Sequence, residues 1–216
     1  MIKNNFKKRI FTSIILILLI VLVSTSNLAL VFCLLVLGVI SFLEFLNITK
    51  KIFKNKFYFF ISNFIFESYV FIFCYSFLIL SNLTQLKIIL FCLLLGCVAS
   101  DIGGFIFGKI LKGPKLTKIS PNKTYSGALG SILLSSLVFY SLIYYFTKNS
   151  SFIFVIVAII TSVACQFGDL FFSYLKRKAK IKDTGDFLPG HGGVLDRLDG
   201  IFFGVPAGFI ALAIFY

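Results

Sequence analysis

The sequence predicts an all-α polytopic membrane protein with about seven transmembrane helices joined by polar loops. Its 216 residues are 59% hydrophobic, whereas soluble domains are about 45–50% apolar. Charged residues make up 13% of the chain, and the mean hydropathy is +1.01. A soluble core of this size could not bury so much apolar surface, so the bilayer must be the solvent for most side chains.

Seven apolar segments divide the chain, and a transmembrane helix needs roughly 20 such residues. They cover residues 10–25, 28–46, 57–80, 86–108, 127–147, 152–175 and 199–216. The first follows a basic stretch, as a signal peptide would, but no clear small-x-small cleavage site leads into a soluble domain. A retained first span is therefore expected, within a single integral membrane domain over residues 1–216.

The third segment is long and contains Asn63 and Glu67, so a bend or a break is an alternative to one continuous span. The distribution of charge bears on this choice. If the N-terminus is cytoplasmic and all seven segments cross, every basic residue except Lys87 and Lys148 lies in the cytoplasm. This agreement with the positive-inside rule predicts seven crossings with the N-terminus and the longer basic loops cytoplasmic, and it counts against two spans in the third segment.

The net charge of +13 has two interpretations. Basic residues orient helices and contact anionic lipid headgroups, but the basic residues of 109–123 and 176–197 exceed what orientation requires. No nucleic acid is expected as a partner, because no soluble domain presents a groove. The five cysteines all lie in apolar segments without a C-x-x-C pattern, and we expect them to be small core residues rather than disulfides or metal ligands.

Four of the eight acidic residues lie inside apolar segments: Glu44, Glu67, Asp101 and Asp169. Ionisable side chains at membrane depth are costly and mark functional sites by default. For Glu44 and Glu67 an alternative is equally open, namely a side chain that reaches the interface or pairs with a neighbouring helix. Asp101 and Asp169 each adjoin a large basic polar loop, which favours a functional role for these two.

A first polar region comprises residues 99–109 and 118–127. Three of its glycines allow the backbone either to line a ligand pocket or to pack closely against another helix: Gly103, Gly104 and Gly108. Ser120 and the proline after it predict a turn that opens the next helix. Lys123 and Thr124 at the start of that helix could hold a phosphate.

A second polar region, residues 165–199, carries a denser pattern. On a helix, Asp169 and Ser173 share one face because they are four residues apart, and two basic residues follow within a turn. Residues 182–199 then combine glycines, a proline, the single histidine and four acids. Carboxylates bind Mg²⁺, which bridges phosphates, and Lys and Arg bind the remaining phosphate charge. The pattern therefore favours a metal–polyphosphate site over an ordinary solvated loop.

Residues 173–199 read S-Y-L-K-R-K-A-K-I-K-D-T-G-D-F-L-P-G-H-G-G-V-L-D-R-L-D. This segment resembles the signature of the phosphatidate cytidylyltransferase family, which is S-x-L-K-R, four residues, K-D, then P-G-H-G-G and D-R-x-D. Residues 99–127 resemble a second conserved stretch of that family, with an Asp before a Gly/aromatic segment and then S-P-x-K-T. The departures are Ser126 in place of a usual Glu, Asn122 in place of a usual Lys, and Phe105 where Tyr is common.

The resemblance implies an enzyme of the bacterial inner membrane, with cytoplasmic active-site loops, that transfers CMP from CTP to phosphatidic acid and releases pyrophosphate. It also implies dependence on Mg²⁺, with a second, monovalent cation left open. The expected principal metal ligands are Asp169 and Asp196, with Asp199 in support. Phosphate contacts are expected from Lys123, Lys176, Arg177, Lys182 and Arg197, and His191 is expected to be structural or a phosphate donor. Further substrate contacts are expected from Asp101, Ser120, Thr124, Ser173, Asp183, Gly192 and Gly193.

Two other functions remain open at this stage. A CTP-dependent polyprenol or lipid kinase would use similar groups but would transfer the γ-phosphate. A transporter predicts internal repeats and polar groups near the membrane midplane, whereas this sequence has no visible repeat and gathers its polar residues on one side. The expected partners are the two substrates and membrane lipids, with a homodimer left open, and Asp183 is expected to form a structural pair with Lys182.

Overall fold

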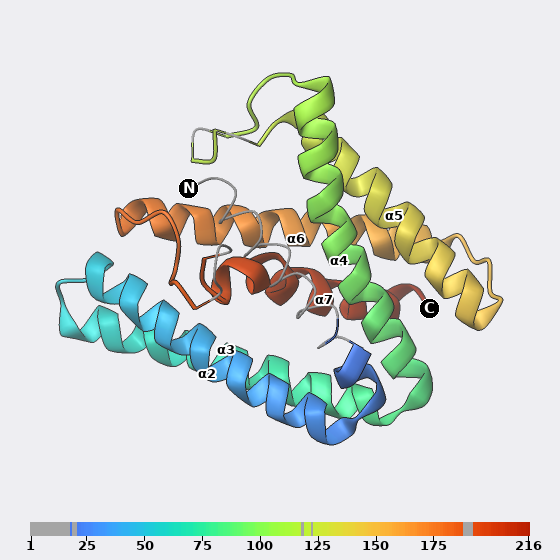
Figure 1. The fold of residues 1–216 in the computed structure, drawn as a ribbon, viewed down its shortest axis with the longest axis horizontal. Helices are drawn as coiled ribbons and strands as arrows, with labels where there is room; N and C mark the ends of the chain where they lie inside the picture. The colour runs from blue at the N-terminus through green and yellow to red at the C-terminus, as the bar shows by residue number, and fades with distance from the viewer. Residues whose placement is uncertain (1–17, 19–20, 118, 122, 188–191) are drawn as a thin grey trace. The chain divides into compact units, whose positions relative to one another are not determined.

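The structure, a computed structural model, describes residue 18 and residues 21–117, 119–121, 123–187 and 192–216. Six α-helices and no β-strand lie within these residues (Figure 1). They are α2 (Asn27–Ile52), α3 (Lys56–Asn82), α4 (Thr84–Leu111), α5 (Tyr125–Thr147), α6 (Ile153–Lys178) and α7 (Leu195–Phe215). The predicted all-α class is confirmed.

All six helices are long and apolar enough to cross a membrane. They coincide with the second to seventh predicted apolar segments, so the polytopic membrane fold is confirmed. Most of the first predicted segment, residues 10–25, lies outside the described residues, and a seventh span stays a prediction. Helix α3 runs without interruption through Asn63 and Glu67, so the alternative of a broken third segment is wrong.

Local capping explains where two of the helices begin. The Ser26 side chain accepts a hydrogen bond from the Ala29 backbone N–H at 3.4 Å before α2. The Thr124 side chain accepts one from the Gly127 N–H at 3.1 Å before α5. Each side-chain oxygen satisfies a backbone donor that has no partner within its helix.

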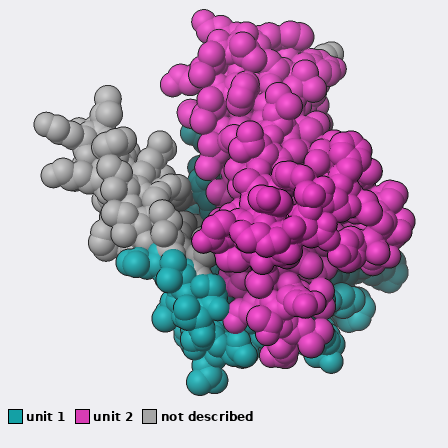
Figure 2. All heavy atoms as spheres, turned by 90° about the vertical axis from the view of Figure 1, so that its right-hand side faces the viewer, with its two compact units in different colours: residues 1–81, 175–198 teal, residues 82–174, 199–216 magenta. Residues whose placement is uncertain are grey.

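The chain divides into two compact units, which Figure 2 distinguishes by colour. Unit 1 comprises Met1–Ser81 and Leu175–Leu198, and unit 2 comprises Asn82–Tyr174 and Asp199–Tyr216. Helices α6 and α7 therefore each contribute to both units. The expectation of a single membrane domain stays a prediction.

In unit 1, α2 and α3 form a helical hairpin held by apolar and polar contacts. The rings of Phe45 and Phe66 stack with their centroids 3.9 Å apart. The Thr49 hydroxyl donates to Asn63 Oδ1 at 3.0 Å, and the Asn63 amide donates to its own helix at the Phe59 carbonyl. Asn63 is buried, and these hydrogen bonds explain how a polar side chain is accommodated there without breaking α3.

In unit 2, α4 and α5 pack closely through their glycines. A Cβ atom added to Gly103 would lie 2.9 Å from the Leu134 Cβ and closer still to the Gly130 carbonyl. A Cβ atom on Gly127 would lie 2.8 Å from the Gly104 carbonyl oxygen. Small residues let membrane helices approach in this way, so the packing interpretation holds for Gly103 and Gly104.

The predicted core position is confirmed for three of the five cysteines, and Cys33 and Cys74 are half-buried. None of the five is in a disulfide, and Cys92, Cys97 and Cys165 are buried. Within unit 2, Gly200 and Gly204 of α7 lie against Cys165 of α6, where any side chain would meet its sulfur or Cβ. This close approach fixes the part of α6 from which Asp169 projects.

Candidate active site

Six of the predicted site residues lie in two polar clusters, one in each compact unit. The Asp169 cluster consists of Asp101, Lys123, Cys165 and Asp169, all in unit 2. The Asp196 cluster consists of Glu44, Lys176, Thr184, Gly193 and Asp196, all in unit 1. Each cluster joins residues that are far apart in the sequence.

The Asp169 cluster is built around an ion pair between α6 and the loop before α5. Lys123 Nζ lies 3.0 Å from Asp169 Oδ2, with 30% and 18% of the two side chains exposed. The other oxygen, Asp169 Oδ1, is buried and has no hydrogen-bond partner among the described residues. A buried carboxylate oxygen without a donor is costly, so this oxygen is suited to a cation.

The loop before α5 fixes the position of Lys123. The Leu116 N–H donates to the Lys123 carbonyl at 2.8 Å, and the Tyr125 N–H donates to the Pro114 carbonyl at 3.2 Å. The Lys123 N–H donates to the Ser120 carbonyl at 3.1 Å and closes the predicted turn. The prediction of a turn at Ser120 and Pro121 that leads into the next helix is confirmed.

Ser126, which replaces a Glu in the resembling family, also holds this loop. Its hydroxyl donates to the Lys112 carbonyl and lies 3.0 Å from the Thr124 hydroxyl. A carboxylate at this position could not donate to a carbonyl. The substitution therefore supplies a loop contact of its own.

The oxygens of the Asp169 cluster suit a hard divalent cation. One ligand atom each from Asp101, Cys165 and Asp169 lies within 4.8 Å of the others. The Cys165 thiol lies 3.8 Å from Asp101 Oδ1 as a hydrogen-bond donor. Mg²⁺ prefers oxygen ligands and thiolates prefer softer metals, so the two carboxylates are the fitting donors here.

The Asp196 cluster folds the second polar region around one carboxylate. Asp196 Oδ1 accepts from Lys176 Nζ at 2.6 Å. Asp196 Oδ2 accepts from the Thr184 N–H at 2.8 Å and from the Gly193 N–H at 3.1 Å. The two side chains of the ion pair are only 13% and 8% exposed. Asp196 therefore ties the end of α6, the intervening segment and the start of α7 together.

Glu44 of α2 is a member of this cluster that the sequence left undecided. It is 6% exposed, and its carboxylate accepts from the Thr184 hydroxyl at 2.6 Å. It also accepts from the backbone N–H groups of Val194 and Leu195, each at 2.9 Å. Leu195 is the first residue of α7, so Glu44 places a carboxylate at the positive end of that helix.

Two glycines of the signature are required by this geometry. Gly192 has φ of +83°, a conformation that side chains rarely adopt, and lies against Asp196. A Cβ atom on Gly193 would collide with the Thr184 hydroxyl and the Glu44 carboxylate. Both positions accept only glycine without a shift in the segment.

Comparison with known proteins shows to which family the chain belongs. Residues 2–215 match a family model described as the cytidylyltransferase family. The chain belongs to the cytidylyltransferase family.

Similar proteins named phosphatidate cytidylyltransferase occur in several bacteria. The one from Helicobacter pylori (strain ATCC 700392 / 26695) is 46% identical over 112 residues, which cover 52% of this chain and 42% of that protein. The one from Rickettsia prowazekii (strain Madrid E) is 42% identical over 142 residues, covering 62% of this chain and 61% of that protein. The one from Mycobacterium leprae (strain TN) is 38% identical over 112 residues, covering 51% and 36%. The chain thus spans less than two thirds of the length of each of these relatives, from 36% to 61%.

The remaining polar residues of the cytidylyltransferase signature lie outside the two clusters. Ser173 is half-buried on α6, four residues after Asp169, as predicted. Asp199 is buried on α7 and accepts from the N–H of the next residue at 3.0 Å. Arg177 and Arg197 are exposed. His191 lies outside the described residues.

One pairing expected in the cytidylyltransferase signature is wrong. Lys182 and Asp183 are both exposed, and neither belongs to the Lys123–Asp169 or the Lys176–Asp196 ion pair. Adjacent side chains on irregular backbone do not face each other as residues one helical turn apart do. Within the signature, the ion pair instead joins Lys176 to Asp196.

Proposed function

We propose that the protein transfers CMP from CTP to phosphatidic acid, giving CDP-diacylglycerol and pyrophosphate. The observation that carries the proposal is that the signature folds around Asp196, whose carboxylate binds Lys176 and two loop N–H groups. The chain that carries this signature belongs to the cytidylyltransferase family. The names of the similar bacterial proteins support the same reaction. The polyprenol kinase and the transporter have no comparable support.

In the proposed reaction, an oxygen of the phosphatidate phosphate attacks the α-phosphorus of CTP. A new P–O bond forms, the bond from the α-phosphorus to the bridging oxygen breaks, and the electron pair leaves with pyrophosphate. The attacking oxygen is already ionised near neutral pH, so no general base is needed. Both reactants are anions, so the protein must neutralise their charge and hold the attacking oxygen in line with the bond that breaks.

Lys123 and Lys176 are the cations that we propose for phosphate binding. Each is held by a carboxylate at 3.0 Å or less, so its ammonium group is positioned before substrate arrives. Preorganised charges stabilise a transition state without the cost of reorganisation. Lys182, Arg177 and Arg197 stay predicted phosphate contacts.

Asp169, with Asp101 beside it, is the group that we propose as a Mg²⁺ ligand, because its buried Oδ1 has no other partner among the described residues. Asp196 and Asp199 stay predicted ligands. A bound divalent cation would supply neutralisation of phosphate charge. The requirement for a monovalent cation and the homodimer also stay predictions.

We further propose the bacterial inner membrane as the location, with the polar loops in the cytoplasm, where CTP is available. The support is the separation of basic residues that the positive-inside rule describes.

A product assay tests the proposed function directly. Purified protein in detergent micelles is supplied with CTP, Mg²⁺ and phosphatidic acid, and the products are separated by chromatography. CDP-diacylglycerol and pyrophosphate in equal amounts are expected. CDP with a newly phosphorylated lipid would instead identify the kinase, and no turnover of CTP would reject both enzymes.

A further inference from the structure

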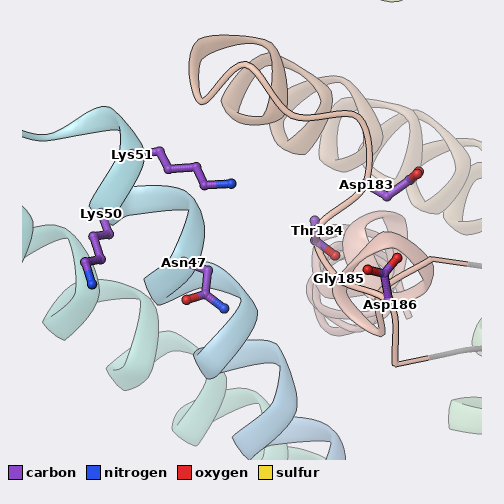
Figure 3. Close-up of a pocket in the computed structure, with 7 residues that line it drawn as sticks. All are labelled: Asn47, Lys50, Lys51, Asp183, Thr184, Gly185 and Asp186. Atoms are coloured by element: carbon purple, nitrogen blue, oxygen red, sulfur yellow. The ribbon is translucent and has the colours of Figure 1, made fainter.

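A cavity of about 680 Å³ lies in unit 1, between the last turns of α2 and the segment after α6. Its lining residues are Asn47, Lys50, Lys51, Asp183, Thr184, Gly185 and Asp186. Figure 3 shows the Lys51 side chain pointing from α2 toward the 183–186 segment, whereas Lys50 points away from that segment. Among the described residues, no ion pair engages either lysine.

A second, apolar cavity of about 300 Å³ adjoins the first and shares Asn47, Thr184, Gly185 and Asp186 with it. The other lining residues are Ile40, Leu43, Glu44 and Phe187. Because they share four lining residues, we treat the two cavities as one depression, with Lys51 and two acidic residues at one end and mainly apolar side chains at the other. A ligand with an anionic head and an apolar body would complement Lys51 at one end and the apolar side chains at the other.

A single ridge of α2 leads into this depression. Leu35, Val39, Leu43, Asn47 and Lys51 follow one another at intervals of four residues, and all are exposed. Such i±4 rows form continuous ridges on a helix surface. The ridge is apolar for three positions, then carries an amide and then a cation.

The length of the ridge suits a lipid in one leaflet. Leu35 and Asn47 are twelve residues apart, or about 18 Å along a helix that rises about 1.5 Å per residue. Half of a bilayer hydrocarbon core is about 15 Å. An acyl chain lying on the apolar part of the ridge would place its headgroup at Asn47 and Lys51.

We propose that this depression binds the anionic phospholipid acceptor, with its phosphate at Lys51 and Asn47 and an acyl chain over Leu43, Ile40 and Phe187. The proposal rests on the proposed function and names the acceptor site for it. Asp183 and Asp186 lie on the opposite wall, and Figure 3 shows the Asp183 carboxylate turned away from Lys51. Lys51 is therefore the charged side chain that α2 directs toward this cavity.

The floor of the depression connects it with the Asp196 cluster. Thr184 lines both cavities, and its hydroxyl lies 2.6 Å from the Glu44 carboxylate and 3.0 Å from that of Asp196. A phosphate bound at Lys51 would thus lie beside the segment that carries the signature. A nucleotide has no apolar body to occupy Ile40, Leu43 and Phe187, so it fits the combined depression less well.

The test measures binding and kinetics separately. Binding is followed by isothermal titration calorimetry in detergent with three ligands: dioctanoyl phosphatidic acid, CTP and inorganic phosphate. Lys51→Ala is expected to weaken phosphatidate binding by about tenfold or more, because a charge-assisted contact is lost. In the assay, its KM for phosphatidic acid rises in proportion while its KM for CTP is unchanged.

Two further variants make the result specific. Leu43→Ser removes an apolar contact, so it should weaken phosphatidate binding and leave inorganic phosphate unaffected. Lys54→Ala is the matched control, since Lys54 is exposed just after α2 and does not line either cavity. Circular dichroism and gel filtration check that each variant folds.

Other results would overturn the proposal. If Lys51→Ala changed CTP binding and left phosphatidate binding unaffected, the depression would be a nucleotide site. If Lys51→Ala and Lys54→Ala had equal effects, phosphatidate binding would depend only on the general surface charge of the protein. Phosphatidate bound through Lys51 by a protein without transferase activity would instead reject the proposed function and keep the lipid site.

Discussion

The Glu44 carboxylate accepts a 2.6 Å hydrogen bond from the Thr184 hydroxyl, which joins α2 to a segment 140 residues later in the chain. The same carboxylate accepts from Val194 and Leu195 at the start of α7. One buried acid therefore holds both the middle of the signature segment and the start of α7. The position of Asp196 depends on a residue that has no place in the signature itself.

Glu44→Gln should lower kcat/KM by about 5- to 150-fold, because an amide offers one acceptor oxygen and leaves a buried donor unsatisfied at a cost of about 1–3 kcal/mol. The matched control is Glu67→Gln on α3, whose side chain is exposed. Both variants are assayed with CTP and phosphatidic acid. Equal activities for the two variants would contradict a positioning role for Glu44.

The hydroxyl of Thr184 provides an independent check of the same contact. Thr184→Ser keeps the donor and should retain most of the activity, whereas Thr184→Val removes it from between Glu44 and Asp196. A general loss of packing would penalise the smaller Ser at least as much as the similarly sized Val. Rescue by Ser alone therefore separates positioning from packing.

The sequence predicted where the helices lie but not which polar side chains contact one another. Apolar runs predicted the bounds of the six spans to within six residues, because the bilayer imposes length and composition on every helix. Lys123 and Asp169 were each predicted as site residues, yet nothing local indicates that they pair across 46 positions. Glu44 and Glu67 look alike in sequence, and only the packing of α2 against the signature segment makes one buried and leaves the other exposed.

Lys123→Ala should reduce kcat/KM for CTP by about 10- to 150-fold, since a charge-assisted contact is worth about 1.5–3 kcal/mol. The variant also leaves Asp169 without its ion-pair partner. Lys115→Ala is the control, because Lys115 is an exposed residue of the same loop. Wild-type rates for Lys123→Ala would mean that the loop serves only to orient the helices.

The proposed orientation predicts opposite labelling of two introduced cysteines in a background without native cysteines. Ser150, exposed between α5 and α6, should react with an impermeant external reagent when changed to Cys. The cytoplasmic position is Asp186→Cys, because Asp186 is exposed, whereas the nearby Thr184 is buried and a cysteine there would not be accessible to the reagent. Asp186→Cys should stay unlabelled in intact cells, and equal external labelling of the two would reject an orientation with these two loops on opposite sides.

Asp196→Asn should reduce the rate by about a thousandfold, since several kcal/mol of transition-state stabilisation depend on placed charge. The variant keeps the size of the side chain but weakens the contact with Lys176 and replaces one of two acceptor oxygens. Asp183→Asn is the control, because Asp183 is exposed without an ion pair in the described part of the signature. It should lose much less activity.

A titration separates the two roles that Asp196 could have. As a metal ligand, Asp196 would make the Asn variant require more Mg²⁺, with partial rescue at high concentration, and would weaken Mn²⁺ binding measured by electron paramagnetic resonance. As an anchor for Lys176 and Thr184 alone, it would leave Mn²⁺ affinity unchanged, and no concentration of Mg²⁺ would restore the rate. Full activity of Asp196→Asn at ordinary Mg²⁺ would remove the residue from both roles, because neither a lost ligand nor a lost anchor is compatible with an unchanged transition state.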